Sequence, residues 1–371
     1  MQSNFIFEGS EKFPMCHAGT LCELSNGDLL AAWYAGSEEG APDSVILGSR
    51  LPAGSQDWQP ARCWVDVVDH ASGNPRVFVG SDGAVWLIAP INYGLWCDGG
   101  TRMFLKRSYD LGETWTDLEI LTNRRRILGK NKPIKVEPDI WILPVEYEGI
   151  GDVAFMRSVN SGKSWRIIDR PGLGAYLDQP TIVQLRDETL LTYMRSWEGY
   201  IFETRSYDKG LSWSEPRPTS LLNPNSGIDM VALRSGELAL VYNPTALGSE
   251  GNLTVDNSTQ TSHTKSGVTA SFAHEDLQNA WVYELRKMLH KAEGGIETHE
   301  SGVLAWGPRT PLFLAVSSDD GENWRNTHIL EDSEGEYSYP AIIQASNGAL
   351  HIIYTHNRTR MKHVCIEKSE L

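Results

Sequence analysis

The chain has 371 residues, of which 40% are hydrophobic, and it carries a formal net charge of -15. This acidic balance argues against a nucleic acid or an anionic membrane as partner, because either needs a broad positive surface. No apolar run approaches the length that spans a bilayer. Residues 1–8 lack the basic start and long apolar stretch of a secretory signal, so we expect a cytoplasmic protein.

Cysteine and histidine spacing gives no sign of a metal or redox centre. The five cysteines are odd in number, widely spaced and without a Cys-x-x-Cys pair, so we interpret them as reduced structural thiols. No histidine pair with a third ligand at zinc spacing occurs, and no calcium loop occurs. We therefore expect an activity that needs no cofactor.

One octapeptide pattern recurs four times along the chain, as Ser-x-(Asp/Asn)-x-Gly-x-x-Trp. In each copy the Asp or Asn can bond nearby backbone N–H groups, the Gly can adopt a positive φ, and the Trp can hold the turn by burial. The copies begin at Ser108, Ser158, Ser206 and Ser317. A weaker fifth copy covers residues 49–58 and keeps the Gly and the Trp but lacks the Asp.

The spacing of these copies indicates the architecture. Their tryptophans are separated by 57, 50, 48 and 111 residues. Recurrence near 50 residues is typical of radially repeated β-sheets, and the doubled last interval indicates one repeat with an insertion. Strand-turn-strand patterns precede the copies, as in residues 20–34 around Asn26 and Gly27, so each repeat contains two hairpins.

A sixth unit, residues 339–364, opens with the same strand-turn-strand pattern and has no octapeptide after it. The sequence therefore predicts an all-β fold, a six-bladed β-propeller with four-stranded antiparallel blades, that forms a single domain over residues 1–371.

The predicted insertion lies in the fifth blade, at about residues 246–307. Residues 251–271 are rich in Ser, Thr, Asn and Gly and favour a flexible loop. Apolar residues at helical spacing predict an amphipathic helix over residues 274–293. Such a helix can pack on the propeller, cover the mouth of a pocket, or join a partner chain in an oligomer. We interpret the one basic run, residues 124–135, as a solvated loop.

The octapeptides resemble Asp-box, or BNR, repeats, and the chain resembles the sialidase superfamily of six-bladed propellers over essentially its whole length. Segments similar to the branch described as predicted neuraminidases begin at Cys16, Asn223, Gly307 and Glu336. The resemblance implies a glycoside hydrolase, without a cofactor, that acts on an acidic sugar or oligosaccharide.

In the sialidases, three arginines clamp the substrate carboxylate, a tyrosine paired with a glutamate is the nucleophile, and an aspartate is the acid/base. The resemblance carries four of these roles onto this chain. Arg309 and Arg195 match two of the arginines, Tyr339 matches the nucleophile, and Asp43 lies where the acid/base loop is expected.

Two positions depart from the family pattern. His17 stands where the first arginine is expected, ten residues before Gly27. Gln179 stands where the glutamate is expected, sixteen residues before Arg195. A phenol is a poor nucleophile at neutral pH without a base or a nearby positive charge. The departures therefore indicate either a changed reaction or a lost one.

The residue types alone leave three functions open. Two guanidinium groups can bind a carboxylate bidentately and favour a neighbouring tyrosinate, while His17 and Asp43 can exchange protons. These groups suit a hydrolase acting on an acidic glycoside. They equally suit a uronate-specific polysaccharide lyase, in which His17 or Tyr339 takes the C5 proton, and a non-catalytic carbohydrate-binding propeller.

Each candidate also has an alternative. Tyr337, two residues before Tyr339, is expected on the same strand face and is a substitute for it in substrate binding. Glu38 and Glu39 share a loop with Asp43 and can replace its carboxylate. The arginines can instead brace the blades, and His17 can satisfy a buried carbonyl.

Overall fold

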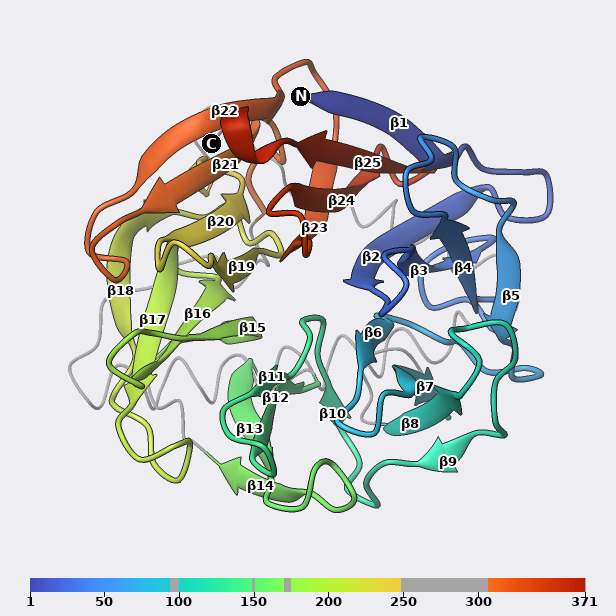
Figure 1. The fold of residues 1–371 in the computed structure, drawn as a ribbon, viewed down its shortest axis with the longest axis horizontal. Coiled ribbons are helices and arrows are strands. Elements are labelled where there is room, and N and C mark those ends of the chain that lie inside the picture. Colours follow the sequence, from blue (N-terminus) through green and yellow to red (C-terminus); the bar gives the residue numbers. More distant parts are fainter. Residues whose placement is uncertain (94–99, 149–150, 170–174, 248–305, 371) are drawn as a thin grey trace, which may run out of the picture.

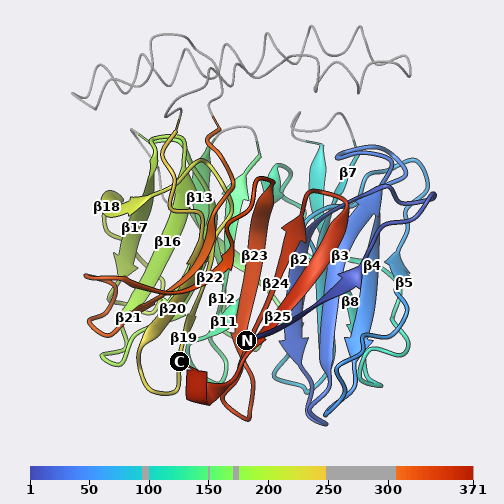
Figure 2. The same cartoon turned by 90° about the horizontal axis from the view of Figure 1, so that it is seen from above.

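The structure, a computed structural model, describes residues 1–93, 100–148, 151–169, 175–247 and 306–370. Six antiparallel sheets stand around a common axis and form a ring (Figure 1). Seen from the side, the strands run between the two faces of this ring (Figure 2). The predicted six-bladed β-propeller is thereby confirmed.

The strands of a blade follow one another from the axis outward (Figure 1). Blade one contains β2 (Met15–Glu23), β3 (Leu29–Gly36), β4 (Val45–Leu51) and β5 (Arg62–Val65). Blade two contains β6 (Arg76–Val79), β7 (Val85–Asn92), β8 (Thr101–Ser108) and β9 (Glu119–Ile120). Blade three contains β10 (Ile127–Leu128), β11 (Ile134–Lys135), β12 (Trp141–Tyr147), β13 (Asp152–Ser158) and β14 (Arg166–Asp169).

The second half of the ring continues in the same way. Blade four contains β15 (Leu177–Gln184), β16 (Leu190–Ser196), β17 (Tyr200–Ser206) and β18 (Arg217–Leu222). Blade five contains β19 (Asp229–Ala232), β20 (Leu238–Tyr242), β21 (Leu312–Ser317) and β22 (Arg325–Glu331). Blade six contains β23 (Tyr337–Gln344), β24 (Leu350–His356), β25 (Arg360–Ile366) and, outermost, β1 (Gln2–Phe7); the 3₁₀ turn η2 (Lys368–Glu370) follows β25.

The last blade is completed by the start of the chain. Strand β1 pairs antiparallel with β25, from Gln2 opposite Cys365 to Phe7 opposite Met361. This pairing joins the two ends of the repeat array and closes the ring without leaving β25 as an unpaired edge. The sequence did not indicate it, because β1 lies outside the repeating pattern.

The innermost position of blade three is divided between two short strands. Strands β10 and β11 both pair with β12, and residues 129–133 leave the sheet between them. Lys130 and Asn131 are only 3% and 2% exposed. The interpretation of residues 124–135 as a solvated loop is therefore wrong for this part, because the segment is buried inside the ring.

Each octapeptide forms the predicted turn. In the first copy the Ser108 hydroxyl donates to Asp110, the Gly112 amide donates to the Ser108 hydroxyl, and the Thr114 amide donates to Asp110. Leu111 and Gly112 have φ values of 60° and 90°. The aspartate thus closes the turn by accepting hydrogen bonds, as expected for a short polar side chain.

The same turns also dock blades two to five, each on the preceding blade. The glycine of each octapeptide, called the box glycine below, lies against the strand next to the innermost position of the previous blade, which is β3, β7, β12 or β16. A Cβ on any of these four glycines would come within 3 Å of a side chain of that strand. The contacts are Gly112 with Leu30, Gly162 with Trp86, Gly210 with Ile142, and Gly321 with Tyr193. Among the box tryptophans, Trp213 stacks on Phe155 of blade three, and Trp324 donates to the Tyr193 hydroxyl of blade four.

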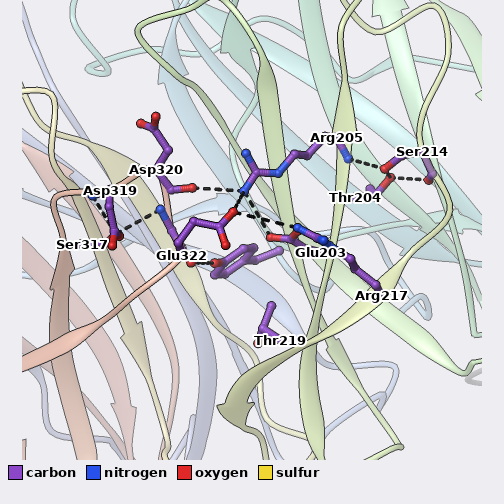
Figure 3. A network of polar contacts seen from close by, with 12 residues as sticks. Glu203, Thr204, Arg205, Ser214, Arg217, Thr219, Ser317, Asp319, Asp320 and Glu322 are labelled. Carbon is purple, nitrogen blue, oxygen red and sulfur yellow. Dashed lines mark hydrogen bonds and ion pairs between the residues drawn. The ribbon is translucent and has the colours of Figure 1, made fainter.

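Arginines reinforce three of these junctions. An arginine on the third strand of one blade donates to the carbonyl just before the box glycine of the next blade. The pairs are Arg50 with Leu111, Arg157 with Lys209, and Arg205 with Asp320. Figure 3 shows the last of them, where Arg205 also approaches Glu203 and Glu322.

Several predictions concern residues outside the described ones. The inserted loop and the helix expected over residues 274–293 fall there, as does Cys97. The other four cysteines are free thiols. No helix within the described residues is long and apolar enough to cross a membrane.

We expect Gly210→Ala to destabilise the protein more than Gly54→Ala. Both glycines have positive φ, near 80° and 75°, so each alanine costs about 1–2 kcal/mol of backbone strain. Only the Gly210 Cβ would clash, at 2.2 Å from the buried Ile142 side chain, whereas Gly54 has open space around it. Overpacking adds about 1–3 kcal/mol. Urea unfolding followed by tryptophan fluorescence measures both losses, and equal losses would contradict the docking role of the box glycine.

Candidate functional site

The innermost strands of several blades contain a bulge with an unusual backbone conformation. Register shifts interrupt β2 after His17, β15 after Asp178 and β23 after Ser338. The bulged residues Ala18, Gln179 and Tyr339 have φ values of 55°, 48° and 51°. Such values are uncommon outside glycine, and backbone strain of this kind clusters at functional sites.

Two of these bulges meet across the ring. The Tyr339 hydroxyl oxygen accepts hydrogen bonds from Arg195 Nη1 at 2.7 Å and from Gln179 Nε2 at 2.9 Å. Arg195 Nη1 also donates to Gln179 Oε1 at 3.1 Å. Because a guanidinium can only donate, Arg195 fixes the amide oxygen on its own side and turns the amide N–H toward Tyr339. The phenol oxygen therefore receives two N–H donors, one of them cationic.

Arg195 is a permanent cation in this setting. Its side chain is buried, and its Nε donates to Asn225 at 2.9 Å. Burial alone lowers the pKa of a guanidinium, but Tyr339 and Asp178 outweigh it and raise the pKa of Arg195. The two predicted arginines approach Tyr339 at similar range, with the guanidinium carbons of Arg195 and Arg309 5.7 Å and 5.8 Å from its ring centre.

His17 packs directly against Tyr339, with ring centroids 4.1 Å apart. It is fully buried, and neither ring nitrogen has a hydrogen-bond partner among the described residues. Burial, followed by the positive field of Arg358 and Arg309, lowers the pKa of His17 well below its usual value. The imidazole is therefore neutral and has one donor and one acceptor to offer a ligand.

Arg309 belongs to an ion-pair network that the sequence did not indicate. Glu336 binds Arg309 Nη1 at 2.8 Å and Arg358 Nε at 2.9 Å. Arg358 also pairs with Glu39. Burial alone raises the pKa of Glu39, but the Arg358 guanidinium outweighs it and holds that pKa below its usual value. Glu39 is therefore an ionised partner of Arg358.

Asp43 lies apart from these residues. Its carboxylate accepts the Ser37 amide N–H at 3.2 Å and the Ser37 hydroxyl at 2.9 Å, on the exposed connection between β3 and β4. Among the described residues, no hydrogen bond or ion pair joins it to Tyr339, Arg195 or His17. Of the carboxylates expected on this loop, Glu39 is the one tied to the ion-pair network.

Tyr337 has different surroundings from Tyr339. It packs in the apolar cluster of blade six with Ile352 and Tyr354, and its hydroxyl donates to the Glu334 carbonyl at 3.4 Å. The expectation that both tyrosines share one strand face does not hold, because the bulge after Ser338 and the positive φ of Tyr339 break the alternation. The structure groups Tyr339, Gln179, Arg195 and His17, with Arg309 beside them.

Glu146 is a further buried residue of the site that sequence reasoning missed. It lies on β12, and its carboxyl accepts the backbone N–H of Gln179. Burial, together with the neighbouring Asp178, raises the pKa of Glu146 to about 8. The group is therefore mostly uncharged at neutral pH. Its position inside a regular strand gave no signal in the sequence.

No three histidine, cysteine or carboxylate side chains of the described residues gather in a way that could hold a metal ion.

Comparison with known proteins adds a family match. The profile of the BNR repeat-like domain matches residues 27–352. An anhydrosialidase from Macrobdella decora is 26% identical over 133 residues. That match covers 33% of this chain and 18% of the curated protein, so it spans less than a fifth of that relative.

Solved structures of similar fold include several glycosidases. A Hadza microbial sialidase superposes with a TM-score of 0.72 at 16% identity, covering 100% of this chain and 69% of that one. The intramolecular trans-sialidase from Ruminococcus gnavus gives 0.68 at 14%, covering 100% and 98%. An α-L-arabinanase from Penicillium chrysogenum gives 0.64 at 13%, covering 100% and 99%. At these identities the likeness establishes the fold alone.

The raised pKa of Glu146 predicts a pH-dependent stability. The folded protein holds this proton more tightly than the unfolded chain, so the stability it contributes is complete below about pH 4.5 and is lost as pH rises through about 8. Glu146→Gln keeps the uncharged form, so between about pH 6 and pH 9 it should lose less stability than the wild type, by on the order of 1–3 kcal/mol.

Urea unfolding at a series of pH values measures this difference. The exposed Glu334→Gln is the matched control and should follow the wild-type curve. A Glu146→Gln curve parallel to the wild type would show that Glu146 does not hold a proton in the folded protein.

Proposed function

Because the chain belongs to the family of BNR repeat-like proteins, we propose that its central site hydrolyses the glycosidic bond of a carboxylated sugar. One observation carries the proposal: the Tyr339 hydroxyl lies 2.7 Å from Arg195 Nη1, in a buried site where a second arginine flanks its ring. The two arginines can stabilise a bound anion beside Tyr339, and they can also stabilise the negative charge that Tyr339 carries as a phenolate.

Arg195 and Arg309 would bind the substrate carboxylate. A guanidinium pairs with a carboxylate through two parallel N–H···O bonds, and such charge-assisted bonds are stronger than neutral ones. Arg309 pairs with Glu336 through Nη1, which leaves its other N–H groups for a ligand. Glu336 and Asn225 hold the two guanidinium groups in place before the substrate arrives.

Tyr339 would then attack the anomeric carbon. Gln179 occupies the position from which a glutamate would take the phenol proton, and an amide cannot do so. The imidazole of His17, packed against the Tyr339 ring, is the proposed proton acceptor. Burial and the nearby arginines lower its pKa in the free protein, and the substrate carboxylate, by offsetting that positive field, would raise its basicity when the sugar is bound. Arg195 stabilises the resulting phenolate through its 2.7 Å hydrogen bond.

A carboxyl group on the β3–β4 connection would protonate the leaving oxygen. Glu39 is unsuited to this, since Arg358 keeps it ionised. We assign the step to Asp43, which has no arginine partner among the described residues. In the second step Asp43 takes a proton from a water molecule, which attacks the anomeric carbon and breaks its bond to Tyr339. His17 then returns its proton to the released phenolate.

The proposal is tested with aryl glycosides that differ only in charge. Wild-type protein is incubated with an α-sialoside, a β-glucuronide and a β-galactoside of the same fluorescent alcohol, and with uronate oligosaccharides. We expect release of the alcohol from an acidic glycoside and none from the galactoside. Near-ultraviolet absorbance from an unsaturated uronate would instead identify a lyase, and calorimetric binding of an acidic sugar without turnover would identify a binding propeller.

We expect Tyr339→Phe to lower kcat at least about a hundredfold while the Kd for the acidic sugar changes less than about threefold, because the lost hydroxyl acts in the chemical step. Tyr337→Phe is the matched control, on the same strand but with its hydroxyl bonded outside the cluster. Steady-state kinetics and calorimetry give both values. A large loss in Tyr337→Phe and none in Tyr339→Phe would exchange the two roles.

Arg309→Gln should weaken binding of the acidic sugar by about ten- to a hundredfold, since a hydrogen bond between charged partners contributes about 1.5–3 kcal/mol. Arg360→Gln removes an exposed arginine near Phe5, away from the site, and should bind normally. Isothermal titration calorimetry compares the two variants. Unchanged affinity in Arg309→Gln would remove the carboxylate-binding role.

A further inference from the structure

The segment of residues 129–133 places a lysine inside the ring. It leaves the inner edge of blade three between β10 and β11 and points toward the propeller axis (Figure 1). Lys130 is 3% exposed, although lysine is almost never fully buried without a partner. The proposed hydrolysis gives this residue no part.

The contacts of the segment converge on the two strained residues of the site. Lys130 Nζ donates to the Pro340 carbonyl, directly after Tyr339, and to Asn131 Oδ1 at 3.0 Å. Asn131 Nδ2 donates to the carbonyls of Gln179 at 3.2 Å and Pro180 at 3.1 Å. Adjacent side chains of one segment thus hold the backbone on both sides of the hydrogen bond between Tyr339 and Gln179.

A third side chain fastens the segment itself. Lys132 pairs with Asp229 at 3.1 Å. Asp229 in turn accepts the backbone N–H of Ile342, two residues beyond Pro340, at 3.0 Å, and the Thr181 hydroxyl at 2.8 Å. The segment is therefore connected to blades four, five and six, and its position is well determined.

Burial of Lys130 is costly. Burial lowers the pKa of its ammonium to about 7, opposed by Asp229 and reinforced by Lys132 and Arg195. A buried charge is expensive unless its partners compensate for the water it loses, and an apolar residue of similar size packs such a position at least as stably. The lysine is therefore poorly explained as a packing residue.

We propose that Lys130 is a positioning residue for Tyr339: its ammonium fixes the Pro340 carbonyl, and with it the strained Tyr339 backbone, and adds positive charge to the site. This inference rests on the proposed function, since it assigns Lys130 a task in that same site. It acts through Tyr339 and does not contact the substrate.

The charge state of Lys130 then shapes the pH dependence of the reaction. The charged and titratable groups that face it are Asp229 of β19, Lys132 of its own segment, Arg195 of β16 and His17 of β2. Deprotonation removes the charge and one N–H donor, so the chemical step should slow as pH rises through about 7. We expect this decline in kcat and not in KM, because the arginines that bind the substrate carboxylate keep their charge.

The test compares wild-type protein with Lys130→Met, Lys130→Arg and Lys135→Met on the acidic glycoside that the wild type cleaves. At about pH 6 we expect Lys130→Met to lower kcat about ten- to a hundredfold with KM within about twofold, as for a displaced reacting group. Lys130→Arg should restore much of kcat and remove the decline near neutrality, because a guanidinium does not deprotonate there. Lys135→Met, at the exposed end of β11, should match the wild type.

A stability measurement separates this role from a structural one. Lys130→Met removes a costly buried charge but leaves the Pro340 carbonyl and Asn131 Oδ1 without its N–H donors, so the two effects offset and its urea midpoint should stay close to the wild-type value. A clear loss of stability that accounts for lost activity would overturn the proposal, as would a Lys130→Met enzyme with wild-type kcat and pH profile. Wild-type protein that cleaves no acidic glycoside would overturn the proposed hydrolysis first, and the role of Lys130 with it.

Discussion

The ring depends on the contact between each box glycine and the blade before it. The lack of a Cβ on these glycines lets the turn of one blade pack closely on its neighbour, and glycine adopts the positive φ of the turn without backbone strain. The four residues are Gly112, Gly162, Gly210 and Gly321. A turn motif thereby becomes an inter-blade spacer. Because this contact recurs at four of the six junctions between blades, it helps to place the innermost strands at the axis, where residues far apart in the sequence form one site.

Two residues on the innermost strands have a strained backbone that the surrounding ring holds in place. Gln179 and Tyr339 both adopt positive φ just before a proline, a conformation that costs free energy in an isolated strand. The surrounding ring holds both residues there, and the bulges turn their side chains toward each other across a separation of 160 residues. Residues 129–133 hold the same two backbones from inside the ring. The site is thus set by long-range packing more than by local preference.

This division explains what the sequence could and could not reveal. The octapeptides act through local hydrogen bonds and turn conformation, so blade number and strand pairing were predictable from them. Arg195, Arg309, Tyr339, His17 and Gln179 were identified through the resemblance to the sialidases, whose site positions were matched to this chain by their distance from the repeats. Lys130, Glu146 and Arg358 were missed, because their surroundings are set by contacts between blades. Tyr337 was misplaced because strand alternation does not survive a bulge.

The side chains near the axis create a positive field, although the whole protein has a negative net charge. The chain carries a net charge of -15, yet Arg195, Arg309, Arg358 and Lys130 all lower the pKa of His17. Burial, reinforced by this positive field, keeps the imidazole neutral, and burial, reinforced by Lys132 and Arg195, lowers the pKa of Lys130 to about 7. With Gln179 in place of a carboxylate, the hydrogen-bond cluster around Tyr339 contains no anion of its own. The carboxylate of the proposed substrate would join Glu336 and Glu39 as a counter-charge for these cations. The acidic balance of the whole chain therefore does not argue against the proposed anionic substrate.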